Sequence, residues 1–376
     1  MQFLRTIVIM LSAIVMAGAS HAAGVVPHAP NGSSQAAATS APAAKASAAR
    51  TALGVSMLPG DRSKTTYDDF RARAGRAPAL WSIWSDWGGP GDPSQSASSQ
   101  LPDLTFLNHL EKHGTAPFIF WQPIDPADLG TAKFSFKHIE AGDWDSYITA
   151  FAVATKAVSG PVLIRFAHEM DGDWFPWSIG LHGNTTTSFI NAWRHIWTIF
   201  HNVGATNVRW VWSPNGCDCA KPTTRPLNPG LDALYPGDKY VDYLGASGFN
   251  WGSYKDRWAT MQVIMKPRMH GFDTMNNTRK GRTGVRRKPI ILAETASAPT
   301  GPSAHAGKNP PGNTKARWIK VGYDLIHSRY PRIKAIVYFN VDMRKLDSNE
   351  DWHLAGASMT AYRDLLRKAS FRGRIQ

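Results

Sequence analysis

The chain has 376 residues and a formal net charge of +14, and 19% of its residues are charged. This length fits one large domain or two average ones, since an α/β barrel takes about 250 residues as a single unit. No nucleic-acid-binding motif accompanies the positive charge, so we expect no nucleic-acid partner. The densest basic stretch, residues 279–288, is interpreted as a solvated cluster, with association with an anionic surface or polymer as the alternative.

Residues 1–22 have the features of a signal peptide. Arg5 provides the positive charge, residues 6–17 the apolar core, and Ser20-His-Ala22 the cleavage site. The apolar run is short for a membrane span. We therefore expect an exported protein, secreted or periplasmic, with no integral membrane segment after cleavage. Residues 23–50 are mostly Ala, Ser, Pro and Gly, which cannot bury a core, so they are predicted to be a disordered linker.

Residues 51–376 are predicted to form one domain in which apolar runs alternate with helical patterns. Strands are predicted at residues 53–58, 79–84, 117–123, 162–167, 208–212, 240–247, 289–293 and 333–339. Helices are predicted at residues 67–75, 104–113, 144–157, 189–204 and 359–368. Strands alternating with helices about eight times indicate an α/β fold, a single (β/α)8 TIM barrel.

Two of the predicted strands lead directly into a glutamate. Residues 162–167 are followed by His168 and Glu169, and then by a loop that contains Trp174, Phe175 and Trp177. Residues 289–293 are followed by Glu294. For a single buried glutamate, an ion pair with a neighbouring Arg or Lys is the simpler interpretation. Two such glutamates, one beside tryptophans, favour hydrolysis of a glycosidic bond, which needs a pair of carboxyl groups.

These motifs resemble glycoside hydrolase family 26, whose best-known members are retaining β-mannanases. The resemblance extends from about Leu53 to the C-terminus and is carried by His168-Glu169-Met-Asp-Gly-x-Trp174-x-Pro-Trp177, by Ala293-Glu294, and by Trp212-Ser-Pro-Asn215, Tyr338-Phe-Asn340 and Asp351-Trp352. It implies that Glu169 is the acid/base and Glu294 the nucleophile, with His168 and Trp174 beside the cleavage point. It also implies β-1,4-mannan as the substrate. Mixed-linkage β-glucan, β-1,3-xylan and a bacterial exopolysaccharide are the alternatives, and no cofactor is implied.

One position departs from the family pattern. Family members usually carry a Tyr near the end of the sixth strand that hydrogen-bonds the nucleophile, whereas this chain has Phe249. A hydrogen bond to an ionised carboxylate contributes about 1.5–3 kcal/mol. Tyr243 and Tyr254 are candidates to replace the missing hydroxyl. The departure also supports an alternative function, a non-hydrolytic polysaccharide-binding or biosynthesis protein on the same fold.

The active site of a TIM barrel lies at the carboxyl ends of its strands, so further side chains are expected around the two glutamates. Packing is the simpler interpretation for each of them alone, and Trp121 and Trp174 are favoured as sugar contacts. Arg165 lies within a buried strand and must pair with a carboxylate near the site. His168 has no second ligand at metal-binding spacing, so no metal is expected there. The predicted substrate-binding residues are His168, Trp174, Trp177, Trp121, Asn215, Phe249, Trp87, Arg165 and Asp351.

Three further expectations follow. The carboxyl groups of Glu169 and Glu294 should lie ~5–5.5 Å apart, the spacing of a retaining enzyme. Cys217 and Cys219 either form a small local disulfide or remain free thiols. The expected partner is a polysaccharide substrate, bound by a monomer.

Overall fold

The computed structural model describes residues 50–57, 62–88, 101–215, 230–252, 254, 258–278, 288–299, 312–346 and 349–375. Within these ranges, eight parallel strands close into a barrel in chain order. The predicted TIM barrel is therefore confirmed. The strands are β1 (Ala52–Ser56), β2 (Leu80–Asp86), β3 (Ala116–Gln122), β4 (Val162–Phe166), β5 (Val208–Trp212), β6 (Tyr243–Asn250), β7 (Ile290–Ser297) and β8 (Ile333–Phe339).

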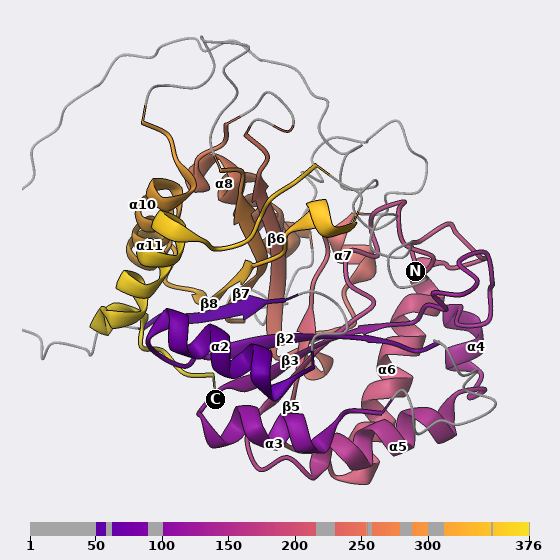
Figure 1. Ribbon diagram of the computed structural model, residues 1–376. Coiled ribbons are helices and arrows are strands. Elements are labelled where there is room, and N and C mark those ends of the chain that lie inside the picture. The colour runs from indigo at the N-terminus through magenta and orange to yellow at the C-terminus, as the bar shows by residue number, and fades with distance from the viewer. Residues whose placement is uncertain are drawn as a thin grey trace, which may run out of the picture.

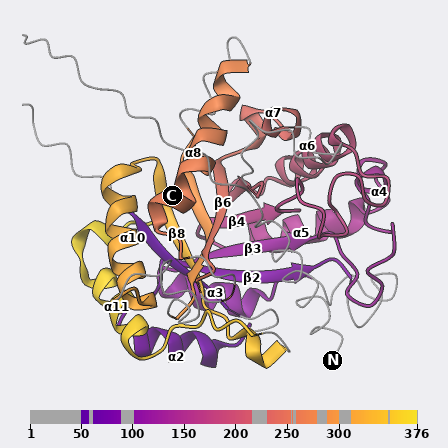
Figure 2. The ribbon, with the colours of Figure 1, turned by 90° about the horizontal axis from the view of Figure 1, so that it is seen from above.

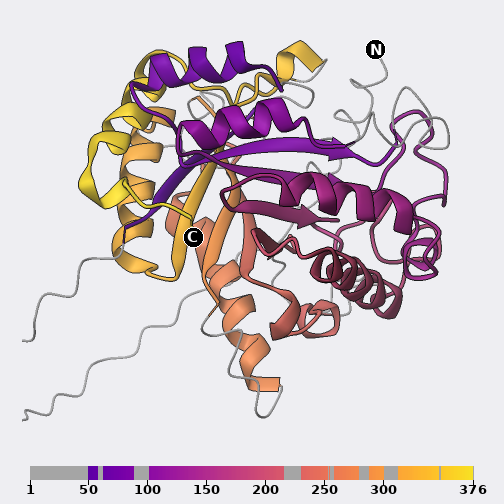
Figure 3. The same ribbon diagram turned by 90° about the horizontal axis from the view of Figure 1, so that it is seen from below.

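The helices form a layer outside the strands (Figure 1). Views from above and below show the same arrangement, with α10 and α11 side by side (Figures 2 and 3). The α-helices are α2 (Lys64–Ala74), α3 (Leu104–Lys112), α4 (Phe136–Glu140), α5 (Asp145–Lys156), α6 (Thr186–Val203), α7 (Leu231–Leu234), α8 (Met261–Thr278), α10 (Lys315–Arg329) and α11 (Gly356–Arg367).

Local sequence explains where several of these helices begin and end. Helix α6 starts at a capping box, in which the Thr185 hydroxyl accepts a hydrogen bond from the Ser188 amide over 3.1 Å. It ends at Gly204, which adopts the left-handed conformation that terminates many helices. Helices α4, α7, α8 and α10 were not predicted. Helix α8 contains Pro267, which is atypical inside a helix. It packs closely on β6 at Gly248, where a Cβ atom would lie 2.4 Å from Ile264.

Two strands end later than the sequence predicted: β6 is shifted by three residues and β7 is longer. Strand β6 continues to Asn250 and β7 to Ser297, so Phe249 and Glu294 lie within strands and not in the loops that follow them. The pairing of β6 with β7 shifts register between Ala246 and Ser247. Every residue of β7 is buried, as expected for a strand covered on both faces.

Other predictions concern parts of the chain beyond those the structure describes. They are the signal peptide, nearly all of the linker, Cys217 and Cys219, and the basic stretch up to residue 287. Among the described helices, none combines the length and apolar character needed to cross a membrane.

Candidate active site

The backbone turns sharply where β4 ends. Ala167 and Glu169 have φ angles of 42° and 53°, in the left-handed region that residues with side chains seldom adopt. Neighbouring strands hold this turn in place. The Ala167 amide donates to the Trp121 carbonyl over 3.0 Å, and the Glu169 amide donates to the Ser213 carbonyl over 2.8 Å. Such strained residues cluster at functional sites, and here the strain presents Glu169 to the mouth of the barrel.

A single arginine contacts both glutamates. Nη1 of Arg165 donates a hydrogen bond to Oε2 of Glu294 over 2.6 Å, and its Nη2 lies 3.9 Å from Oε1 of Glu169. Nη2 also donates to the Ser247 hydroxyl over 2.9 Å. The guanidinium is fully buried over the ring of Phe120, 4.6 Å from its centroid. The prediction that Arg165 pairs with a carboxylate is confirmed, and this contact brings Glu169 and Glu294 together.

Burial and charge act in opposite directions on the nucleophile candidate. Burial raises the pKa of Glu294 to about 7, and the nearby Glu169 carboxylate adds to the rise, whereas Arg165 lowers it. Two carboxyl groups beside one cation cannot both ionise freely in a buried site. The closer contact of Arg165 favours negative charge on Glu294.

His168 is enclosed by aromatic rings. The centroid of its imidazole ring lies 4.9 Å from the ring centroid of Phe175, 5.5 Å from that of Trp177 and 5.6 Å from that of Phe120. Burial, and secondarily the charge of Arg165, holds the pKa of His168 well below its usual value, so the imidazole is neutral. Its Nδ1 atom has no hydrogen-bond partner among the residues that the structure describes. The His168 side chain is 1% exposed, so this nitrogen is enclosed by the protein in this structure.

Trp174, which the sequence predicted to contact a sugar, is half-buried in the loop after β4. Its ring covers Gly172, where a Cβ atom would lie 2.6 Å from the indole carbons. Only glycine permits this close approach. The indole N–H of Trp174 is buried and has no hydrogen-bond partner within the described part of the chain.

Three of the predicted sugar contacts are wrong, because their side chains are buried in the protein interior. Trp121 is 0% exposed, stacks on Phe151 at 4.4 Å and donates to the Tyr147 hydroxyl, in the layer between β3 and α5. Trp87 is 1% exposed and packs on Trp121. Aromatic residues after strands can point outward to the helices as easily as into the mouth, and the sequence pattern does not distinguish these directions.

Trp177 is the third of these residues. It is 1% exposed, stacks on Phe175 with ring centroids 4.2 Å apart, and donates from its indole nitrogen to the His168 carbonyl over 2.8 Å. This bond fixes the turn between His168 and Glu169. Trp177 therefore supports the site and offers no face to a ligand.

Phe249 is half-buried at the mouth and packs on Phe339 and Trp352, with centroids 5.7 and 5.5 Å away. Neither tyrosine proposed from the sequence supplies the missing hydroxyl. Tyr254 bonds the backbone of Asp351 through its hydroxyl, and Tyr243 is the first residue of β6, at the opposite end of the strand. Arg165 makes the hydrogen bond to Glu294 instead.

Asn215 and Asp351 are both partly exposed. The Asn215 amide donates to the Asp171 carboxylate over 2.7 Å, which ties the loop after β5 to the loop after β4. The Asp351 carboxylate already has basic neighbours: Lys315 at 3.8 Å, Arg344 at 3.3 Å, and a short contact with His353. These neighbours neutralise most of the negative charge of the Asp351 carboxylate.

Sequence reasoning missed one cation next to the site. Arg268, on α8, donates from Nε to the Ser247 carbonyl and from Nη1 to the Ile264 carbonyl. Burial lowers the pKa of Arg268 to about 10, and the Glu169 and Asp171 carboxylates oppose this shift. The sequence shows Arg268 as an arginine in a segment that was not predicted to be helical, and this pattern did not indicate that it lies near Glu169.

The fold and site define a TIM-barrel protein with two buried glutamates at the carboxyl ends of its strands. Residues 137–278 match the model of Glycosyl hydrolase family 26. This confirms glycoside hydrolase family 26, the family that the sequence motifs indicated, for the segment that contains His168 and Glu169.

Individual relatives agree with this assignment. Endoglucanase H of Acetivibrio thermocellus is 33% identical over 265 residues, which is 69% of this chain and 25% of that protein. Mannan endo-1,4-beta-mannosidase A and B of Caldalkalibacillus mannanilyticus is 30% identical over 115 residues, 28% of this chain and 20% of that protein. This chain thus spans a quarter or less of either relative. The catalytic domain of the Bacillus sp. JAMB-750 endo-beta-1,4-mannanase shares the fold, with a TM-score of 0.59, 14% identity, and coverage of 86% of this chain and 87% of that one.

Proposed function

We propose that the protein is an exported, retaining, endo-acting glycoside hydrolase that cleaves a β-linked polysaccharide. The observation that carries the proposal is the contact of Arg165 with both Glu169 and Glu294. A glycosidase needs two carboxyl groups in different protonation states on either side of the scissile bond. An arginine closer to one of them favours such a difference. The match of the surrounding segment to a glycoside hydrolase family supports the same reaction class.

The reaction would proceed by double displacement. The Glu294 carboxylate attacks the anomeric carbon while the Glu169 carboxyl group donates its proton to the leaving oxygen, so that the glycosidic bond breaks and a glycosyl ester forms. Glu169 then takes a proton from water, whose oxygen attacks the anomeric carbon and releases Glu294. This requires the carboxyl groups to be ~5–5.5 Å apart. Arg165 stabilises Glu294 as the anion that attacks and leaves.

For the substrate, we propose β-1,4-mannan first, because the motif resemblance is to mannanases. A second candidate is a β-glucan. The observation favouring it is the long match to Endoglucanase H, which covers 69% of this chain, against 28% for the mannosidase. Because that match spans only a quarter of the endoglucanase, other parts of that protein are equally able to account for its name.

The experiment that tests this function is release of reducing sugars from mannan, glucomannan, barley β-glucan, β-1,3-xylan and bacterial exopolysaccharides. Wild-type protein is compared with Glu169→Ala and Glu294→Ala. We expect release from at least one polymer, and loss of 100-fold or more in each variant, since general acid–base catalysis contributes about 10²–10⁴-fold. No release from any polymer, together with tight binding to one, would refute hydrolysis and favour the non-hydrolytic alternative.

A further inference from the structure

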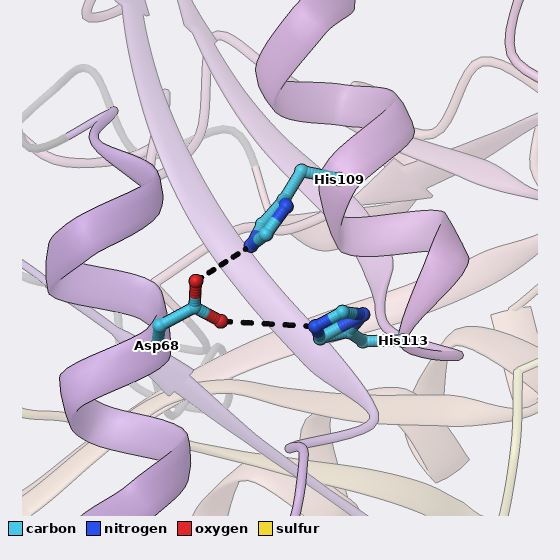
Figure 4. A group of neighbouring side chains, drawn as sticks. All are labelled: Asp68, His109 and His113. Carbon is cyan, nitrogen blue, oxygen red and sulfur yellow. Dashed lines mark ion pairs between the residues drawn. The ribbon is translucent and has the colours of Figure 1, made fainter.

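Outside the active site, three ligand-type side chains meet between α2 and α3. Nε2 of His109 lies 3.2 Å from Oδ2 of Asp68, and Nε2 of His113 lies 3.7 Å from Oδ1 of Asp68. Each of the three offers one atom such that all three atoms lie within 4.8 Å of one another. Figure 4 shows both imidazoles turned from one helix toward the carboxylate on its neighbour.

The helices bring these groups together for simple geometric reasons. His109 and His113 are four residues apart, so they lie one turn apart on the same face of α3 and its C-cap. Asp68 faces them from α2. The buried ring of Tyr67 packs against both imidazoles, with centroids 5.5 and 5.7 Å away, and limits their rotation. Nε2 of His109 is itself buried, whereas the Asp68 side chain is 39% exposed, so a small ion would enter from the side of the carboxylate.

We propose that Asp68, His109 and His113 bind a divalent transition-metal ion, with Zn²⁺ as the best fit. Two imidazole nitrogens and one carboxylate oxygen form a donor set that zinc accepts, with water as the fourth ligand. Bonds of about 2.1 Å in a tetrahedral ion place neighbouring donors about 3.4 Å apart. The three donor atoms lie within 4.8 Å of one another, and each imidazole nitrogen lies 3.2 or 3.7 Å from a different oxygen of Asp68, so a small rotation of the carboxylate brings one oxygen to this spacing.

The position of the cluster indicates a structural role. His113 lies just before β3, whereas Glu169 follows the carboxyl end of β4, so the ion would bind on the face of the barrel opposite the active site. Near the cluster, the hydroxyl of Tyr67 on α2 also hydrogen-bonds the hydroxyl of Thr115, which lies between α3 and β3, over 2.6 Å. An ion there would fasten α2 to α3 and would stabilise the folded state by binding it in preference to the unfolded chain.

Arg71 competes with an incoming ion for the Asp68 carboxylate. Nη2 of Arg71 lies 3.2 Å from Oδ1 of Asp68, but both side chains are substantially exposed, at 43% and 39%. An exposed pair of this kind contributes little free energy, so Arg71 can turn toward solvent when an ion enters.

A second cluster of ligand-type groups is less suitable for an ion. It consists of Asp342, Asp351 and His353. Arg344 pairs with both of its carboxylates, and Lys315 pairs with Asp351. Its negative charge is already matched by two cations. Lys315 is 7% exposed and cannot turn to solvent as the 43% exposed Arg71 can. That cluster also has one histidine against two at Asp68, so we assign the ion to the Asp68 cluster.

The proposal is tested by titrating chelator-treated, desalted protein with ZnCl₂ at pH 7.5 in a calorimeter. We expect micromolar or tighter binding at this site, and at least tenfold weaker binding for His109→Gln and for His113→Gln. Thermal unfolding provides a second measurement. Zinc should raise the Tm of the wild type in a saturable manner and should leave the Tm of both variants unchanged. Circular dichroism without zinc confirms that the variants are folded.

The matched control is His195→Gln. His195 also pairs with an aspartate, Asp145 at 2.6 Å, but it has no second histidine in the pair. This variant should bind zinc like the wild type. Absence of micromolar binding by the wild type would overturn the proposal. Binding that persists unchanged in both His109→Gln and His113→Gln would place the ion elsewhere in the chain, and would overturn it equally.

Discussion

Arg165 and Glu294 form a buried ion pair, with Nη1 donating to Oε2 over 2.6 Å. Family resemblance would place a tyrosine hydroxyl on this carboxylate, but the chain has Phe249 there, and its ring packs on Phe339 and Trp352. In this chain the donor to Glu294 is the charged guanidinium of Arg165. Hydrogen bonds to charged groups contribute about 1.5–3 kcal/mol, so this bond compensates for the missing hydroxyl.

Replacing Arg165 with methionine should shift the pH dependence of catalysis. Arg165 lowers the pKa of Glu294, which burial raises to about 7, so its removal raises that pKa further. Because the attacking carboxylate must be ionised, the acidic limb of kcat/KM should move to higher pH by about one unit or more. The loss of activity should therefore be larger at pH 6 than at pH 8. Kinetics on the preferred polymer across pH 5 to 9 measure this shift.

The control for this shift is Arg165→Lys, which restores the positive charge without the forked geometry. It should return the acidic limb toward its wild-type position while kcat stays reduced. If Arg165→Met lowers kcat and leaves the acidic limb in place, the arginine positions Glu294 without tuning its charge, and our electrostatic account is wrong.

Phe249→Tyr provides a second prediction about the same carboxylate. Because Arg165 already donates to Glu294, a new hydroxyl should change kcat/KM by less than about threefold, well under the tenfold that 1.4 kcal/mol would produce. Phe249→Leu is the matched comparison for loss of the ring. An increase of tenfold or more in the tyrosine variant would show that the arginine is a poor substitute.

Much of the fold could be predicted from the sequence, because strands buried on both faces are continuous apolar runs. All eight strands were located, as were Arg165, Glu169 and Glu294. Helix α8 was missed because Pro267 is atypical inside a helix. With it, Arg268 was missed as a neighbour of Glu169.

The direction of aromatic side chains was less predictable. Phe120 and Trp121 are consecutive in β3, yet Phe120 lies under Arg165 inside the barrel whereas Trp121 packs outward on Phe151. Alternation along a strand assigns opposite faces, but it cannot say which face is the lumen when both are apolar. The φ angles at Ala167 and Glu169 likewise have no signature in the sequence, since neither residue is a glycine.

Gly172 allows the Trp174 ring to pack directly on its backbone, which predicts that substitutions at the two positions are coupled. In Gly172→Ala the new Cβ would sit 2.6 Å from the indole carbons and push the ring away. Both Gly172→Ala and Trp174→Ala should raise KM by up to about tenfold, as expected when one aromatic contact of about 0.5–1.5 kcal/mol is lost. The double variant should be no worse than Trp174→Ala alone. If the effects of the two substitutions on KM were additive, Gly172 would support the loop conformation independently of the Trp174 ring.

A further prediction distinguishes the two glutamates. Glu169→Ala should still cleave aryl glycosides with good leaving groups, because departure of such groups needs no proton donor, but hydrolysis of the glycosyl ester should become slow. An initial burst of released phenol should therefore precede slow turnover, and added azide should accelerate turnover as a nucleophile that needs no base. Glu294→Ala should show neither effect. A burst in Glu294→Ala would reverse the assigned roles.

Asp86, at the end of β2, should make the protein less stable as the pH rises. Its carboxyl group is buried, its Oδ1 atom has no partner among the residues described, and burial raises its pKa from 3.8 to about 7. Between these two values the folded state holds a proton that the unfolded state has lost, so the free energy of unfolding falls as pH rises from about 4 to 7. Asp86→Asn cannot ionise and should be more stable than the wild type at pH 8 by up to about 4 kcal/mol, yet similar to it at pH 4. Urea unfolding at both pH values measures the difference.

Asp364→Asn, on the exposed side of α11, serves as the control and should change stability by no more than about 0.5 kcal/mol. Equal stability of Asp86→Asn and wild type at pH 8 would mean that Asp86 is ionised without cost in the folded protein, with Arg62 matching its charge completely.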